Sequence, residues 1–117
     1  MSVAALKREP NYDELNIGLT DGDREALIAD ISVTLADTFM VMVKTQGVHW
    51  NIAGPMFHSV HELTEEQYKD MFDATDDLAE RIRALGGHAP ASYNQYQKLS
   101  SLKDRDESGT AEQLMRT

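Results

Sequence analysis

Apolar residues recur at steps of three and four along two long stretches of the chain, which is the period of one face of an α-helix. Because proline interrupts a helix interior, Pro10, Pro55 and Pro90 limit where these helices can lie. The first stretch predicts a helix over about residues 22–50. Its apolar stripe consists of Ile28, Ile31, Leu35, Phe39 and Met42.

The second stretch predicts a helix over about residues 56–85, ended by Gly86 and Gly87 as a left-handed C-cap. Only a few residues connect it to the first helix, so the two should form an antiparallel hairpin. Its apolar stripe consists of Phe57, Val60, Thr64, Tyr68, Met71, Thr75, Leu78, Ile82 and Leu85.

The remainder of the chain predicts a short helix at about 93–99 and the start of a third long helix at 110–117, where the sequence stops. No stretch has the alternation expected of a β-strand. We therefore predict an all-α fold, with residues 1–19 as an N-terminal extension and 20–117 as one helical domain.

Composition narrows the class of function. The 117 residues include no cysteine, which excludes a disulfide scaffold, thiolate zinc sites and thiol catalysis. The net charge of -9, from 11 basic and 20 acidic residues, repels nucleic acid and attracts cations. With neither an apolar run long enough to cross a bilayer nor a signal-peptide core at the N-terminus, we expect a cytoplasmic protein away from membranes.

Four residues with metal-binding side chains share one narrow strip of the second helix. With His61 at zero on a helical wheel, Glu65, Asp76 and Glu80 fall at roughly 40°, 60° and 100°. His61 and Glu65 are four residues apart, as are Asp76 and Glu80, so each pair can converge on one ion. About 16 Å of helix separates the two pairs, too far for one metal to bind both in the same chain.

This gap predicts a site shared between two copies of the chain. If a second copy packs antiparallel about a two-fold axis, His61 and Glu65 of one copy face Asp76 and Glu80 of the other. His49 lies one turn before the hairpin bend and His61 one turn after it, which places both imidazoles at the same level. We therefore expect a homodimer with two metal sites.

Two imidazoles and several carboxylates without sulfur suit Fe(II), Mn(II) or Zn(II), and the carboxylates also suit Fe(III). Simpler interpretations remain open. His49 or His61, taken singly, is an ordinary core residue, and Trp50 is a core aromatic. A second acidic strip is either a solvated face or a surface that concentrates cations. This strip consists of Glu66, Asp70, Asp73 and Asp77.

These motifs resemble the Dps family of ferritin-like mini-ferritins. The shared elements are HWN-x-x-G-x-x-F from His49 to Phe57, the dipeptide His61-Glu62, and D-x-x-A-E-R-I from Asp76 to Ile82. The resemblance implies a ferritin-like four-helix bundle, of which this sequence contains helices A and B, the connecting helix and the start of helix C. It also implies a hollow dodecamer that oxidises Fe(II) with hydrogen peroxide and stores the ferric product, so protecting against oxidative stress.

By motif position, the resemblance assigns His49, His61 and Glu65 to one subunit's share of the ferroxidase site, and Asp76 and Glu80 to the two-fold mate's share. Iron is the implied metal, with Zn(II) as a substitute. The family usually has Asp at the position of Glu65, and it has two further long helices. A second copy of the hairpin, or a separate chain that carries those helices, could complete the four-helix unit. The absence of a lysine-rich tail argues against DNA binding. The alternative function is a non-enzymatic helical interaction module, or a fragment that needs a second chain for the remaining helices.

Overall fold

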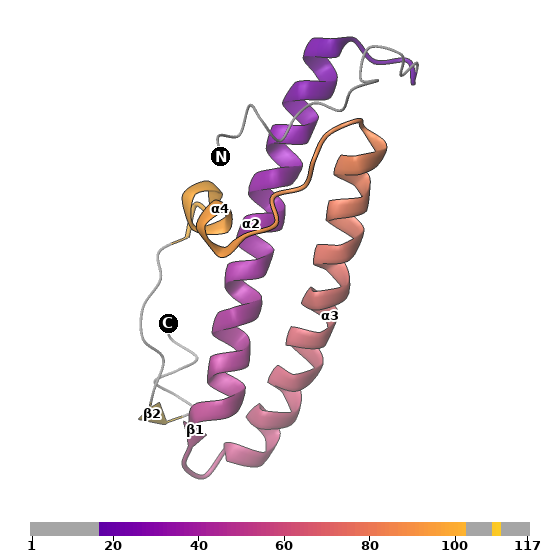
Figure 1. Ribbon diagram of the computed structural model, residues 1–117. Coiled ribbons are helices and arrows are strands. Elements are labelled where there is room, and N and C mark those ends of the chain that lie inside the picture. Colours follow the sequence, from indigo (N-terminus) through magenta and orange to yellow (C-terminus); the bar gives the residue numbers. More distant parts are fainter. Residues whose placement is uncertain (1–16, 103–108, 111–117) are drawn as a thin grey trace.

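The computed structural model describes residues 17–102 and 109–110. In chain order the elements of these residues are α2 (Asp21–Asn51), β1 (Ile52–Ala53), α3 (Phe57–Ala84), α4 (Tyr93–Leu99) and β2 (Gly109–Thr110). Figure 1 shows α2 and α3 side by side as a long antiparallel hairpin, with α4 lying across α2. The helices expected at about 22–50, 56–85 and 93–99 correspond to α2, α3 and α4.

Local sequence signals explain where the long helices begin and end. Thr20 caps α2, since its hydroxyl accepts a hydrogen bond from the Asp23 amide at 3.1 Å. Gly54 in the bend has φ 99° and Gly86 after α3 has φ 91°, conformations that glycine adopts without strain. The amide of Gly87 then bonds the Ile82 carbonyl at 3.1 Å and closes the last turn of α3.

The hairpin is held by two clusters of buried side chains. Ile28, Leu35 and Ile82 form the cluster near the open end, and all three are at most 2% exposed. Val48, Ile52 and Val60 form the cluster beside the bend. The second cluster joins the last turns of α2 to the start of α3. It therefore fixes which residues on either side of the bend face each other.

The short helix α4 is attached to α2 by a ring contact and by hydrogen bonds. Tyr96 stacks on Phe39 with ring centroids 4.3 Å apart. At the end of α4, Asp37 accepts hydrogen bonds from the Ser100 hydroxyl at 2.7 Å and from the Ser101 amide and hydroxyl, both at 2.8 Å. These contacts close a loop of more than sixty residues and define one face of the hairpin.

The expectation that the chain contains no strand is wrong in one detail. Ile52 pairs with Gly109 and Ala53 with Thr110 as two short parallel strands beside the bend. Two-residue strands are too short to produce an alternating pattern in the sequence. The expected third long helix at 110–117 falls, after Thr110, on residues outside those that the structure describes.

One exposed residue and one hydropathy value also differ from the sequence-based expectations. Trp50 is 66% exposed in the single chain, so it is not a core aromatic here. By length and composition alone α2 could cross a membrane, because an 18-residue stretch of it has a mean hydropathy of 1.8. The central helix of a helical bundle has the same properties, so this value by itself assigns no membrane location.

Candidate metal centre

The bend of the hairpin brings the rings of His49 and His61 into direct contact. His49 lies in the last turn of α2 and His61 near the start of α3. The two rings stack with centroids 3.7 Å apart and planes inclined by 18°. Each ring also bonds the other residue's backbone, with His49 Nδ1 2.7 Å from the His61 carbonyl oxygen and His61 Nδ1 2.8 Å from the His49 carbonyl oxygen.

These reciprocal hydrogen bonds determine which ring nitrogens are available to a metal. A carbonyl oxygen only accepts hydrogen bonds, so the Nδ1 atoms of His49 and His61 must both carry the proton. In the neutral rings Nε2 then keeps its lone pair, which is the form in which imidazole binds a metal. A hydrogen bond from the opposite nitrogen to a backbone carbonyl is the usual support of a metal-binding histidine.

Neighbouring side chains restrict the rings further. The Thr64 hydroxyl contacts the carbonyl oxygens of Val60 at 2.7 Å and His61 at 3.1 Å, and it lies 3.4 Å from His49 Nδ1. Phe57 stacks on His61 at 5.0 Å, and Tyr68 meets His49 edge-on at 5.2 Å. His49 is only 6% exposed. The two imidazoles are therefore held in fixed orientations before any metal arrives.

Glu65 lies one turn after His61 on α3 and is partly exposed. Its carboxylate is 3.3 Å from the ammonium of Lys69, a further turn along the helix. The helical wheel placed Glu65 beside His61, but it did not predict that a lysine would pair with the Glu65 carboxylate.

The second pair of predicted ligands lies farther along α3. Asp76 and Glu80 come together with Asp77, and the ligand atoms of the three exposed carboxylates lie within 4.8 Å of one another. The sequence wheel assigned Asp77 to the other acidic strip, although its spacing of three from Glu80 also places the two carboxylates one turn apart. About 16 Å of helix separates Glu65 from Asp76, so the predicted ligands of one chain fall into two groups, called half-sites below, that cannot bind the same metal ion together.

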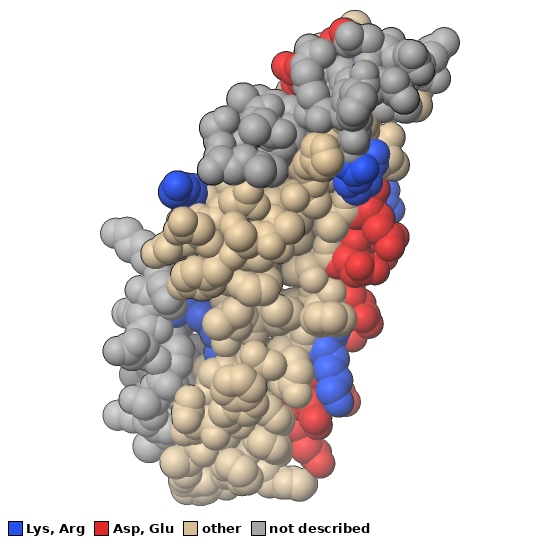
Figure 2. Space-filling view, viewed as in Figure 1, with Lys and Arg blue, Asp and Glu red and all other residues tan. Residues whose placement is uncertain are grey.

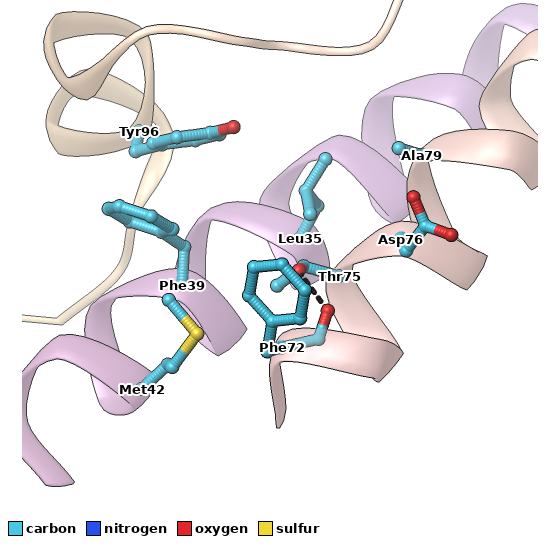
Figure 3. A pocket seen from close by; sticks show the side chains of 8 residues that line it. All are labelled: Leu35, Phe39, Met42, Phe72, Thr75, Asp76, Ala79 and Tyr96. Atoms are coloured by element: carbon cyan, nitrogen blue, oxygen red, sulfur yellow. Dashed lines mark hydrogen bonds between the residues drawn. The ribbon is translucent and has the colours of Figure 1, made fainter. Parts of the chain in front are cut away.

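A groove between α2, α3 and α4 occupies the space between the half-sites. One pocket in it has a volume of about 280 Å³, and Figure 3 shows Phe39 and Tyr96 on one side of it and Phe72 and Asp76 on the other. A neighbouring pocket of about 360 Å³ shares Met42 and Phe72 with the first. Phe72 lies between the two half-sites, on the strip of α3 that carries the predicted ligands, and its side chain is 64% exposed.

Charge is distributed unevenly around this groove. In Figure 2 the Asp and Glu side chains gather along one edge of the molecule, over α3, while most of the face in view carries neither acidic nor basic residues. The α3 segment alone has eight acidic and three basic residues, a net -5 out of the -9 of the whole chain. The acidic edge therefore attracts cations, whereas the groove is suited to contact with another apolar surface.

Comparison with known proteins identifies the fold. A model of the ferritin-like domain matches residues 28–117. An uncharacterized low temperature-induced protein of Nostoc sp. is 41% identical over 90 residues, which cover 77% of this chain and 50% of that protein. DNA protection during starvation protein 2 of Bacillus anthracis is 33% identical over 89 residues, which cover 76% of this chain and 61% of that protein.

Solved structures agree with these sequence matches. The Dps protein of Vibrio cholerae O1, described as a member of a broad superfamily of ferritin-like diiron-carboxylate proteins, superposes with a TM-score of 0.80 at 29% identity, over 96% of this chain and 67% of that one. This chain spans about half the length of the first of the curated relatives. The observed hairpin with its connecting helix is a partial ferritin-like helical bundle, as the sequence predicted. The chain belongs to the ferritin-like family and, within it, to the Dps proteins.

Proposed function

We propose that this chain provides the ligands of a mini-ferritin ferroxidase centre, in which Fe(II) is the substrate and hydrogen peroxide the oxidant. The observation that carries the proposal is the pair of stacked imidazoles with both Nδ1 atoms bonded to carbonyls, which leaves two Nε2 atoms for metal. Carboxylates supply the remaining donors, and their hardness also suits the ferric product. Membership of a family with diiron-carboxylate relatives supports iron as the metal.

The complete site is proposed to form between two copies of the chain. A two-fold axis near the middle of α3 would place Glu65 of one copy opposite Asp76 of the other, and His61 opposite Glu80. Phe72 then lies beside the axis, where its exposed ring can enter the groove of the second copy. This arrangement accounts for an apolar groove lying between two polar half-sites. By resemblance, such dimers would be the units of a dodecamer.

Each ligand group has a separate task in the proposed reaction. The acidic edge of α3 raises the local concentration of Fe(II). His49, His61 and Glu65 hold the metal on one side of the interface, and Asp76 and Glu80 of the mate hold it on the other. Two Fe(II) ions each lose one electron, and hydrogen peroxide takes up both electrons to give two hydroxide ions. Ferric iron is then stored, and consumption of peroxide without release of radicals protects the cell.

The test compares two double variants of α3 that have the same chemistry but different positions. H61A/E65A removes one half-site, whereas H58A/E62A removes an exposed His–Glu pair of identical spacing, whose side chains lie 3.4 Å apart. We expect H61A/E65A to abolish rapid Fe(II) oxidation by peroxide with helicity unchanged, and H58A/E62A to retain it. Unchanged oxidation by H61A/E65A would overturn the assignment.

The second candidate function is a helical interaction module without catalysis, and the unpartnered groove with its exposed Phe72 favours it. In that case the acidic residues only solvate the surface. Titration with Zn(II) followed by native mass spectrometry separates the two. Two or more metal ions per dimer support the ferroxidase, and none supports the module.

A further inference from the structure

Between His61 and Glu80, Lys69 is the one basic side chain on the strip of α3 that carries the proposed ligands. Its Nζ lies 3.3 Å from Glu65 Oε1, and both side chains are partly exposed, at 64% and 44%. It projects from the same strip as His61, Glu65 and Asp76, at roughly 80° on the wheel that places His61 at zero. A cation of the protein itself therefore occupies the position next to a proposed metal ligand.

An ammonium and a divalent metal compete for the same carboxylate. Glu65 can accept hydrogen bonds from Lys69 or donate electron pairs to a metal, and a second positive charge within a few ångström of a bound metal repels it. Lys69 must therefore leave Glu65, or stay at a cost in metal affinity. This competition is absent where no lysine stands one turn after the carboxylate.

The structure also provides a second partner for the displaced ammonium. Asp73 lies four residues after Lys69, just as Glu65 lies four residues before it, so both carboxylates are one turn from the lysine. Lys69 and Asp73 line the same pocket of about 360 Å³, together with Met42, Gln46, Tyr68 and Phe72. This pocket gives the Lys69 side chain space to rotate away from Glu65 and toward Asp73.

We infer that Lys69 is an internal counter-ion that pairs with Glu65 in the metal-free protein and transfers to Asp73 when a divalent cation binds Glu65. The inference rests on the proposed function, since it takes Glu65 as a ligand. It assigns Lys69 a role in setting metal affinity: the lysine screens Glu65 from weakly binding cations and lowers the affinity of the site. Asp73, which the sequence placed on a second acidic strip, becomes the group that makes this release favourable.

The test measures Zn(II) affinity of the intact chain by calorimetry, with a charge-matched control. K69M removes the competing cation, and K98M removes an exposed lysine from α4 with the same change in net charge. We expect K69M to bind Zn(II) roughly two- to fivefold more tightly than K98M, which is the range that exposed ion pairs span. The difference should shrink as salt is added, because salt screens the ion pair.

A double-mutant cycle then tests the transfer to Asp73. D73N should weaken Zn(II) binding in the wild-type background. Its effect should be smaller in the K69M background, because that variant has no lysine ammonium for Asp73 to pair with. Equal affinities of K69M and K98M, or equal effects of D73N in both backgrounds, would overturn the inference while leaving the metal site intact. If H61A/E65A binds Zn(II) as tightly as the wild type, the proposed function itself fails, and this inference fails with it.

Discussion

Replacing Asp37 tests how α4 is fixed to the hairpin. Asp37 accepts three hydrogen bonds from Ser100 and Ser101, at 2.7, 2.8 and 2.8 Å. Hydrogen bonds to a charged acceptor contribute more than neutral ones, but exposure to water reduces their net value, so we assign each about 0.7 kcal/mol. The D37A variant should therefore lose about 2 kcal/mol of the free energy that docks α4, equivalent to about a thirtyfold rise in its opening constant.

Hydrogen–deuterium exchange of the segment 93–102 measures this opening directly. We expect D37A to exchange faster throughout the segment, while a matched change on the same helix, D30A, leaves the exchange rate of α4 unchanged. Asp30 is exposed and two turns away from Asp37 on α2. If D37A and D30A exchange alike, the three hydrogen bonds do not hold α4, and the Phe39–Tyr96 stack must do so instead.

The same contacts predict a dependence on pH. Burial raises the pKa of Asp37, but hydrogen bonds from Ser100 and Ser101 outweigh it, and the net effect is a pKa below the usual value. The unfolded segment therefore binds more protons than the docked one between the two pKa values, and docking strengthens as pH rises through this window. The stabilisation is complete above the unfolded pKa of about 3.9 and is lost as pH falls through the folded pKa. The difference in exchange between wild type and D37A should vanish below this window.

Three further predictions concern stability and can be measured by urea unfolding. G87A should lower the free energy of unfolding by about 1–2 kcal/mol, because the added Cβ would lie 3.0 Å from a side-chain atom of the buried Ile28. G47A lies in the interior of α2, where no atom outside the adjacent residues and the local helix backbone lies within 4 Å of the new Cβ. It should instead raise the free energy of unfolding by about 0.5–1 kcal/mol, and a loss of stability would show that the site is not open. I82A should cost about 3 kcal/mol, since Ile82 is fully buried, and a cost below about 1 kcal/mol would contradict the assigned core.

The helical part of the fold was predictable because it rests on local signals. The period of three and four defined the apolar stripes, and Gly86 ended α3 as expected, with φ 91°. Ile28, Leu35 and Ile82, all members of those stripes, form the buried cluster that joins the helices. The paired strands β1 and β2 were not predictable, because two residues carry no period and their partners lie far apart in the sequence.

The meeting of the two histidines at the bend was predictable from the sequence, and their contacts were not. Spacing placed His49 and His61 at one level, but only the folded bend reveals that each ring bonds the other's carbonyl. Likewise, the Lys69–Glu65 pair depends on side-chain rotamers that a helical wheel leaves open. The bonds from Ser101 to Asp37 span 64 positions and follow from the path of the chain around α2.

The central claim is that each metal site takes ligands from two copies of the chain, and a mixed dimer tests it most directly. One chain carries H61A/E65A and the other D76N/E80Q, and the heterodimer is isolated by a tag on one of them. Each variant alone should bind no Zn(II) at these sites. In the heterodimer, one site combines the intact His61 and Glu65 with the intact Asp76 and Glu80, so we predict half of the wild-type metal content by native mass spectrometry. A heterodimer that binds no more metal than its parents would contradict the shared site.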